Sequence, residues 1–450
     1  MPVPLRLRRL TTAALPVLAA VALTACSVNY PNSVFTRHTD FNREIDVLWK
    51  ILIYLGTAVF IFVEGILLYV LVRYRRRSDN DRPKHVHGNT TLEILWTATP
   101  ALILAFIAVP TVRTIFTTQA KAKADALQVE VIGHQWWWEF RYPQYKITTA
   151  NELYLPVGRT VNFTLHTADV IHSFWIPPMG GKRDLVANHT NYLWFTPDSV
   201  GVQAWNGMCV EYCGTSHANM RFKMFTVTPA EFAQWATHQQ SPAVFGAVPA
   251  PGAAAAGAAA TPAGAAAPAS PANPAAATQT AAAGAAGAAA APDTSAAAPA
   301  TAQATVQQAG FIAYPREKMP AYTVPRTPIP ASLRYNDALV GDAERGRQLL
   351  STGQGGCVGC HMISGNPVMM GIVGPNLTHV GSRQTIAGGL FPNDTRHLAR
   401  WIKNSREMKP GVIMPTLGKG EIDPVTKAQS PMGLTDEQIA DIVAYLQALK

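Results

Sequence analysis

Charged residues are scarce in this sequence. Asp, Glu, Lys and Arg make up only 14% of the 450 residues, whereas hydrophobic residues make up 48%. A soluble enzyme is normally less apolar, so the composition indicates membrane-spanning segments. The net charge of +9 does not indicate nucleic-acid binding, because the basic residues near the N-terminus cluster beside apolar runs and no nucleic-acid-binding motif accompanies them.

Cysteine is also scarce, and its number is odd. The five cysteines are Cys26, Cys209, Cys213, Cys357 and Cys360. An odd number argues against a fold built only on disulfides, so each cysteine needs its own explanation.

The first 25 residues predict an export signal, with three arginines followed by an apolar stretch. The small residues before Cys26 resemble the lipobox of bacterial lipoproteins, whose cysteine becomes lipid-modified and forms the new N-terminus. Residues 1–25 are therefore predicted to be removed and Cys26 to be lipidated. The alternative is an ordinary cleavage site followed by a buried thiol.

Two apolar runs within residues 26–117, at about 48–72 and 92–116, are each long enough to cross a bilayer as a helix. The arginine-rich loop between them predicts a cytoplasmic turn, with both termini outside the cytoplasm. Glu64 lies inside the first run, where an ionised side chain is costly, so we expect it to face protein. Glu93 begins the second run at its cytoplasmic end.

The remainder of the chain divides by pattern into three parts. Residues 118–240 contain short β-prone segments separated by Pro, Gly and Asn, which predicts an all-β sandwich or barrel. Residues 241–325 are largely Ala, Pro and Gly, which predicts a flexible linker. Residues 326–450 predict an all-α domain, closed by a helix with capping-box spacing at Thr435 and Gln438. The whole is thus a multidomain membrane protein with a two-helix transmembrane hairpin.

The segment Cys357-Val-Gly-Cys360-His361 matches the attachment motif of c-type haem, in which two thiols bind the porphyrin and the histidine ligates iron. Zinc or a redox disulfide are the alternatives for the cysteine pair alone. Met414 precedes a proline in an extended loop and is the best candidate for the second axial ligand. Met408 and Met432 are its rivals, and Met362, Met369 and Met370 lie nearer to the attachment motif.

This last part resembles the class I cytochrome c domain, with Gly374-Pro375-Asn376-Leu377 at the position of the proline loop of that family. The resemblance implies that Gly346 in the first helix lies against Tyr445 in the last.

A second cluster of soft ligands lies upstream. Cys209, Cys213, His217 and Met220 follow closely on one another, and His172 precedes them. Thiolate, imidazole and thioether groups favour copper over hard cations, and two thiolates can bridge two copper ions. The set is completed by the backbone carbonyl of Glu211, and it resembles the dinuclear CuA centre. A disulfide or a structural zinc site is the alternative.

The segments 92–97, 133–138, 169–177 and 209–220 together resemble subunit II of cytochrome c oxidase, and the appended haem domain resembles the caa-type version. The resemblance implies a cupredoxin fold that passes electrons to a catalytic subunit I. It also implies that Trp136 is an electron-entry residue, that the Glu211 side chain binds magnesium at the subunit interface, and that Glu93 guards a proton channel. From the residues alone, Trp136 fits a packed aromatic cluster equally well.

We therefore expect the electron-input subunit of a proton-pumping, oxygen-reducing haem-copper oxidase, with one haem c and one CuA centre. Its expected partners are subunit I, other oxidase subunits and a quinol-oxidising complex or cytochrome as donor, in a bacterial inner membrane with the redox domains on the periplasmic side. The alternatives are a subunit of a copper-containing nitric oxide reductase and a stand-alone membrane cytochrome. The linker would let the haem domain swing to the copper site.

Overall fold

The computed structural model describes residues 32–76, 78, 87–120, 124–198, 204–243 and 310–450. The predicted export signal, Cys26 and residues 244–309 of the predicted linker lie outside these residues. Of the two compact units in the chain, one contains all of the described residues, both those before residue 246 and those after residue 308.

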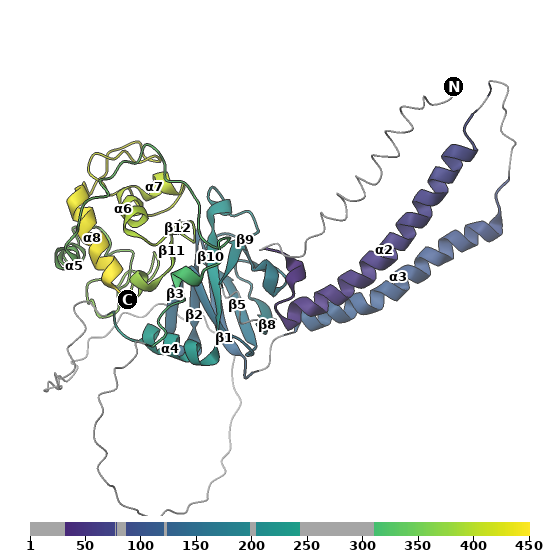
Figure 1. Ribbon diagram of the computed structural model, residues 1–450, viewed down its shortest axis with the longest axis horizontal. Coiled ribbons are helices and arrows are strands. Elements are labelled where there is room, and N and C mark those ends of the chain that lie inside the picture. The colour runs from purple at the N-terminus through teal and green to yellow at the C-terminus, as the bar shows by residue number, and fades with distance from the viewer. Residues whose placement is uncertain (1–31, 77, 79–86, 121–123, 199–203, 244–309) are drawn as a thin grey trace, which may run out of the picture. The chain divides into compact units, whose positions relative to one another are not determined.

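Two long apolar helices follow the N-terminal turn η1 (Val34–Thr36): α2 (Asp40–Arg73) and α3 (Thr90–Gln119). They lie side by side (Figure 1). Thr39 and Asn89 cap their N-termini by accepting hydrogen bonds from backbone N–H groups. Both helices are long and apolar enough to span a membrane, and they contain the two predicted spans.

The β domain consists of two five-stranded sheets, which confirms the predicted all-β class. The first sheet has the order β3-β2-β1-β5-β8 and the second the order β4-β10-β9-β6-β7. The strands are β1 (Leu127–His134), β2 (Trp137–Tyr142), β3 (Ile147–Ala150), β4 (Glu152–Pro156), β5 (Val161–Thr167), β6 (His172–Trp175), β7 (Arg183–Leu185), β8 (Asn191–Phe195), β9 (Ala204–Cys209) and β10 (Arg221–Val227). Short 3-10 turns lie at η2 (Pro143–Tyr145), η3 (Pro177–Met179) and η4 (His217–Asn219).

Aromatic side chains from both sheets form the core of this domain. Trp138 of the first sheet packs edge-on against Phe174 of the second, with ring centroids 5.6 Å apart, and Phe174 stacks on Phe222 at 5.0 Å. All three side chains are buried. Buried residues of both sheets thus fill the space between the sheets and hold the strand ends in fixed positions.

The helix α4 (Pro229–Gln240) closes the β domain, with Thr228 and Glu231 forming a capping box. The predicted linker range also includes residues 310–325, which are described and pack against the β domain. Tyr314 is buried there, and its ring stacks on that of Phe225 with centroids 5.1 Å apart. We call residues 310–323 the strap; it contains the turn η5 (Arg316–Lys318).

The C-terminal domain is helical (Figure 1). Its helices are α5 (Ala343–Ser351), α6 (Thr395–Lys403), α7 (Ser405–Met408) and α8 (Asp436–Ala448), with a turn η6 (Val380–Ser382) and a small hairpin of β11 (Thr385–Ile386) and β12 (Phe391–Pro392). The predicted capping box at Thr435 and Gln438 is present at the start of α8.

The helices α5 and α8 cross where α5 has a glycine. A Cβ atom at Gly346 would lie 2.0 Å from the carbonyl oxygen of Asp441 and 2.9 Å from the Cβ of Tyr445. The absence of a side chain therefore permits the close crossing, and the expected contact between Gly346 and Tyr445 is confirmed.

Candidate copper and haem sites

One end of the second sheet gathers the predicted copper ligands. His172 is the first residue of β6 and Cys209 the last residue of β9. The chain then loops through Cys213 and His217 and returns at Met220, directly before β10. The amide of Cys209 donates to the carbonyl of Met220 at 3.0 Å, so the antiparallel pairing of β9 and β10 closes the base of the loop.

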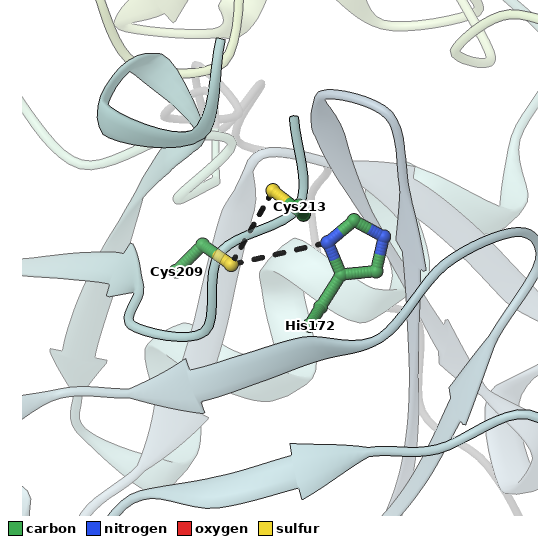
Figure 2. A group of neighbouring side chains, drawn as sticks. All are labelled: His172, Cys209 and Cys213. Atoms are coloured by element: carbon green, nitrogen blue, oxygen red, sulfur yellow. Dashed lines mark hydrogen bonds between the residues drawn. The ribbon is translucent and has the colours of Figure 1, made fainter. Parts of the chain in front are cut away.

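The donor atoms fall into two groups. In the first, Cys209 Sγ lies 3.8 Å from His172 Nδ1 and 3.2 Å from the carbonyl oxygen of Glu211. In the second, Cys213 Sγ lies 3.6 Å from His217 Nδ1 and 3.8 Å from Met220 Sδ. Figure 2 shows His172 pointing toward the two sulfur atoms of the first and second groups. Each group offers a thiol, an imidazole and one weaker ligand.

This arrangement fits two soft metal ions better than the alternatives. The two sulfur atoms lie 3.8 Å apart, whereas a disulfide bond measures about 2.05 Å. A single zinc ion would draw all its donors around one centre, whereas here each imidazole faces a different sulfur. The donors therefore suit a pair of ions that the two sulfurs bridge.

Once one of the two thiols is ionised, it opposes ionisation of the other. A hydrogen bond from the Cys213 thiol lowers the pKa of Cys209, and the resulting Cys209 thiolate raises the pKa of Cys213. Both cysteines can become thiolates together only where positive charge compensates them. Two metal ions supply that charge, so the electrostatics agree with the donor geometry.

Asp169 and Gly133 fix the orientation of His172. Asp169 Oδ1 accepts a hydrogen bond from His172 Nε2 at 2.8 Å, which leaves Nδ1 free to face the sulfur. A Cβ atom at Gly133 would lie 2.6 Å from Cδ2 of His172. Both residues belong to segments quoted in the sequence analysis, but spacing alone gave neither of them a role.

The predicted haem residues line one cavity in the C-terminal domain. Cys357, Cys360, His361 and Met414 all contribute to its wall, together with Leu350, Leu398, Ile442 and Leu446. An apolar cavity with two thiols and two axial donors in its wall fits a covalently bound haem.

His361 is held as an iron ligand would need to be. Its Nδ1 donates to the carbonyl oxygen of Pro375 at 2.8 Å, which leaves Nε2 free. Burial lowers the pKa of His361, which favours the neutral imidazole that a metal requires. A Cβ atom at Gly374 would lie 2.6 Å from the ring, so the proline loop packs directly on the histidine.

The loop that carries Met414 is tied down on one side by α7. Ser405 Oγ donates to the Met414 carbonyl at 2.8 Å. Arg406 donates to the carbonyls of Val412 and Ile413, each at 3.1 Å, and to Asp423 at 2.6 Å. The rival Met408 is buried in the helical core instead. We call Arg406 and Asp423 the loop clamp; the sequence gave no signal for it.

Of the other predicted site residues, Trp136 lies beside the copper donors and Glu93 lies far from them along the chain, in α3. Trp136 is 8% exposed, and its Nε1 donates to the Cys213 carbonyl at 2.9 Å. The loop from Cys209 to Met220, which we call the copper loop, therefore contacts Trp136 directly. Glu93 lies in the first turn of α3 and is exposed. Cys26 lies outside the described residues.

Comparison with known proteins covers the three ordered parts of the chain. The family "Cytochrome C oxidase subunit II, transmembrane domain" matches residues 38–114, "Cytochrome C oxidase subunit II, periplasmic domain" matches 146–227, and "Cytochrome c" matches 343–450.

Three relatives illustrate the similarity. A cytochrome c oxidase subunit 2 of Alkalihalophilus pseudofirmus is 29% identical over 398 residues, covering 87% of this chain and 83% of that protein. A probable cytochrome c oxidase subunit 2 of Rickettsia bellii is 30% identical over 225 residues, covering 45% of this chain and 82% of that protein. The Bacillus subtilis subunit 2 is 40% identical over 186 residues, covering 38% of this chain and 52% of that protein, about half its length. The chain therefore belongs to the cytochrome c oxidase subunit II family, in the form that carries a C-terminal cytochrome c domain.

Proposed function

We propose that this chain is the electron-input subunit of a haem-copper oxidase and passes electrons from a haem c in its C-terminal domain to a CuA centre in its β domain. The observation that carries the proposal is that one chain contains two groups of metal-binding side chains, the paired thiol–imidazole groups and the cavity lined by Cys357, Cys360 and His361. The family implies both cofactors. When bound, they supply reversible one-electron oxidation and reduction.

The chain's own residues have distinct tasks in this proposal. Cys209, Cys213, His172, His217, Met220 and the Glu211 carbonyl would hold the copper ions. Cys357 and Cys360 would attach the haem, and His361 and Met414 would serve as its iron ligands. The buried strand ends hold the copper donors in place, which keeps rearrangement small when the charge changes.

Further assignments rest on the resemblance to the family. Trp136 serves electron entry, the Glu211 side chain binds a magnesium ion shared with subunit I, and Glu93 guards a proton channel. Cys26 carries lipid. The domain ranges predicted from the sequence belong to the same proposal, except that residues 310–323 form the strap and not part of a linker.

The family implies a membrane-anchored subunit with a periplasmic domain. We propose that both redox domains face the periplasm of a bacterial inner membrane, beside subunit I, which reduces oxygen to water and pumps protons. A quinol-oxidising complex or a cytochrome supplies the electrons.

The test is turnover by the purified complex that contains this chain. We expect oxygen uptake with reduced donor and no comparable consumption of nitric oxide. Oxygen uptake near zero together with nitric oxide turnover would instead support the reductase alternative, which neither the matched families nor the relatives described above favour.

A further inference from the structure

A buried lysine joins the two redox domains. Lys409 belongs to the loop of Met414, yet its Nζ donates to the carbonyl of Trp136 in the β domain at 2.6 Å and to that of Ala387 in the haem domain at 2.9 Å. Only 1% of Lys409 is exposed. Burying an ammonium group costs several kcal/mol unless partners satisfy it, so this lysine is not an incidental surface contact.

A buried glutamate of the β domain contacts the haem domain in turn. Glu152, the first residue of β4, is 2% exposed. Its Oε1 accepts the backbone N–H groups of Gln384 at 2.7 Å and Thr385 at 2.9 Å, both in the haem domain. Burial raises the pKa of Glu152 to about 7, although the charge of Arg383 and these hydrogen bonds lower it.

The strap adds a third connection. Arg316 donates to the carbonyl of Asn393 at 2.8 Å, and Gln384 donates to the carbonyl of Tyr314 at 2.8 Å. Because Tyr314 is buried in the β-domain core, the strap links both domains through one segment.

Two loops, one from each redox domain, pack against the same indole ring, that of Trp136. A Cβ atom at Gly214, in the copper loop, would lie 3.0 Å from the Trp136 ring, and one at Gly411, in the loop of Met414, would lie 2.8 Å from it. Trp136 also lines the cavity that contains Cys357 and His361. Only glycines allow both loops to approach the ring so closely, and each has a positive φ that favours glycine.

We propose that Lys409 and Glu152 are the anchors of a built-in dock, which holds the haem cavity against Trp136 so that the haem domain donates electrons from a fixed position. The dock replaces the expected picture of a domain that swings on its linker. Both anchors are positioning residues. The inference rests on the proposed function, because it names the path between the two sites of that function.

The first experiment uses the full chain with both cofactors in detergent and measures lysine acylation by mass spectrometry. The reagent should modify the exposed Lys427 rapidly and the docked Lys409 at least about tenfold more slowly. Equal rates at the two lysines would overturn the dock.

Variants then test the anchors by hydrogen–deuterium exchange of the segment 383–386. Glu152→Ala should remove the protection of the Gln384 and Thr385 amides and raise Lys409 acylation by about tenfold. Glu152→Gln keeps an acceptor oxygen and should retain most of the protection. Lys409→Met should speed exchange in the same segment, whereas the control Lys427→Met should not. Unchanged exchange in both Glu152→Ala and Lys409→Met would refute the proposal.

The copper and haem spectra show in each variant that both domains are folded. Flash reduction of the haem tests the dock and the proposed electron transfer from haem to copper separately. A copper centre that is reduced in the wild type while Lys409 is freely acylated removes the dock and leaves the proposed function standing. A protected Lys409 with a copper centre that is never reduced would leave the dock standing and contradict the proposed function.

Discussion

At the scale of single residues, Cys213 carries the sharpest prediction. In Cys213→Ser a hard hydroxyl replaces one of the two soft sulfurs, so the copper pair loses a bridge. We expect the near-infrared absorption of the CuA centre to disappear while the haem spectrum stays intact. Tyr212→Phe is the matched control, because Tyr212 is exposed in the same loop and its ring is not a donor to the pair. An unchanged near-infrared band in Cys213→Ser would contradict the ligand assignment.

The same scale shows what spacing can and cannot predict. The sequence predicted the copper donors as one group because four of them lie within a short loop and His172 precedes it, and the structure brings these side chains together. The sequence did not reveal Asp169 or Gly133 as partners of His172, since one accepts a hydrogen bond and the other matters only by lacking a side chain. Both roles depend on contacts that form after folding.

At the scale of elements, the loop clamp makes α7 a support for the iron ligand. Arg406→Leu removes three hydrogen bonds to the loop and to Asp423, and hydrogen bonds of charged groups contribute about 1.5–3 kcal/mol each. We expect the weak red absorption band of sulfur-ligated ferric haem to fall at least about tenfold. The haem itself should stay attached through Cys357 and Cys360. A full-strength band would mean that the loop holds Met414 without the clamp.

Protonation of Asp423 in the clamp should also set the pH below which Met414 no longer binds the haem iron. Burial raises the pKa of Asp423, but hydrogen bonds from the Val425 and Thr426 amides and the charge of Arg406 outweigh it and lower the pKa below its usual range. The stabilisation is therefore complete above about pH 4, the ordinary value, and is lost as pH falls through the lowered pKa. A spectral titration should show the red band constant from neutral pH to about pH 4 and falling below it. Loss of the band near pH 6 would contradict this assignment.

Periodic and capped elements were predictable from sequence, and aperiodic ones were not. The spans in α2 and α3, the closing helix α4 and the capping box of α8 follow from local apolar patterns. The strap has no such period, and its order comes from Tyr314 packing on the distant β domain. The Ala- and Pro-rich sequence before it gave no sign that the strap would pack there.

At the scale of the whole molecule, the contacts between the redox domains join residues more than two hundred positions apart, such as Glu152 and Gln384. No local pattern encodes a pairing of that kind, so the sequence indicated two separate units. The structure instead places one lysine, one glutamate and one strap at their boundary. A path from haem to copper then depends on tertiary packing and not on linker length.

The two domains should nevertheless differ in how much they need their cofactors. The β domain has a continuous aromatic core of its own, whereas the short helices of the C-terminal domain surround an apolar cavity lined by Cys357, Cys360 and His361. In the double variant Cys357→Ser and Cys360→Ser, that cavity loses its covalently bound haem. We expect the melting temperature of the helical signal to fall by roughly 10 °C or more, because several kcal/mol of buried apolar contact are lost. The near-infrared copper band should persist, and Lys409 should become as reactive as Lys427. Loss of the copper band together with the helical signal would show that the β domain also depends on the haem.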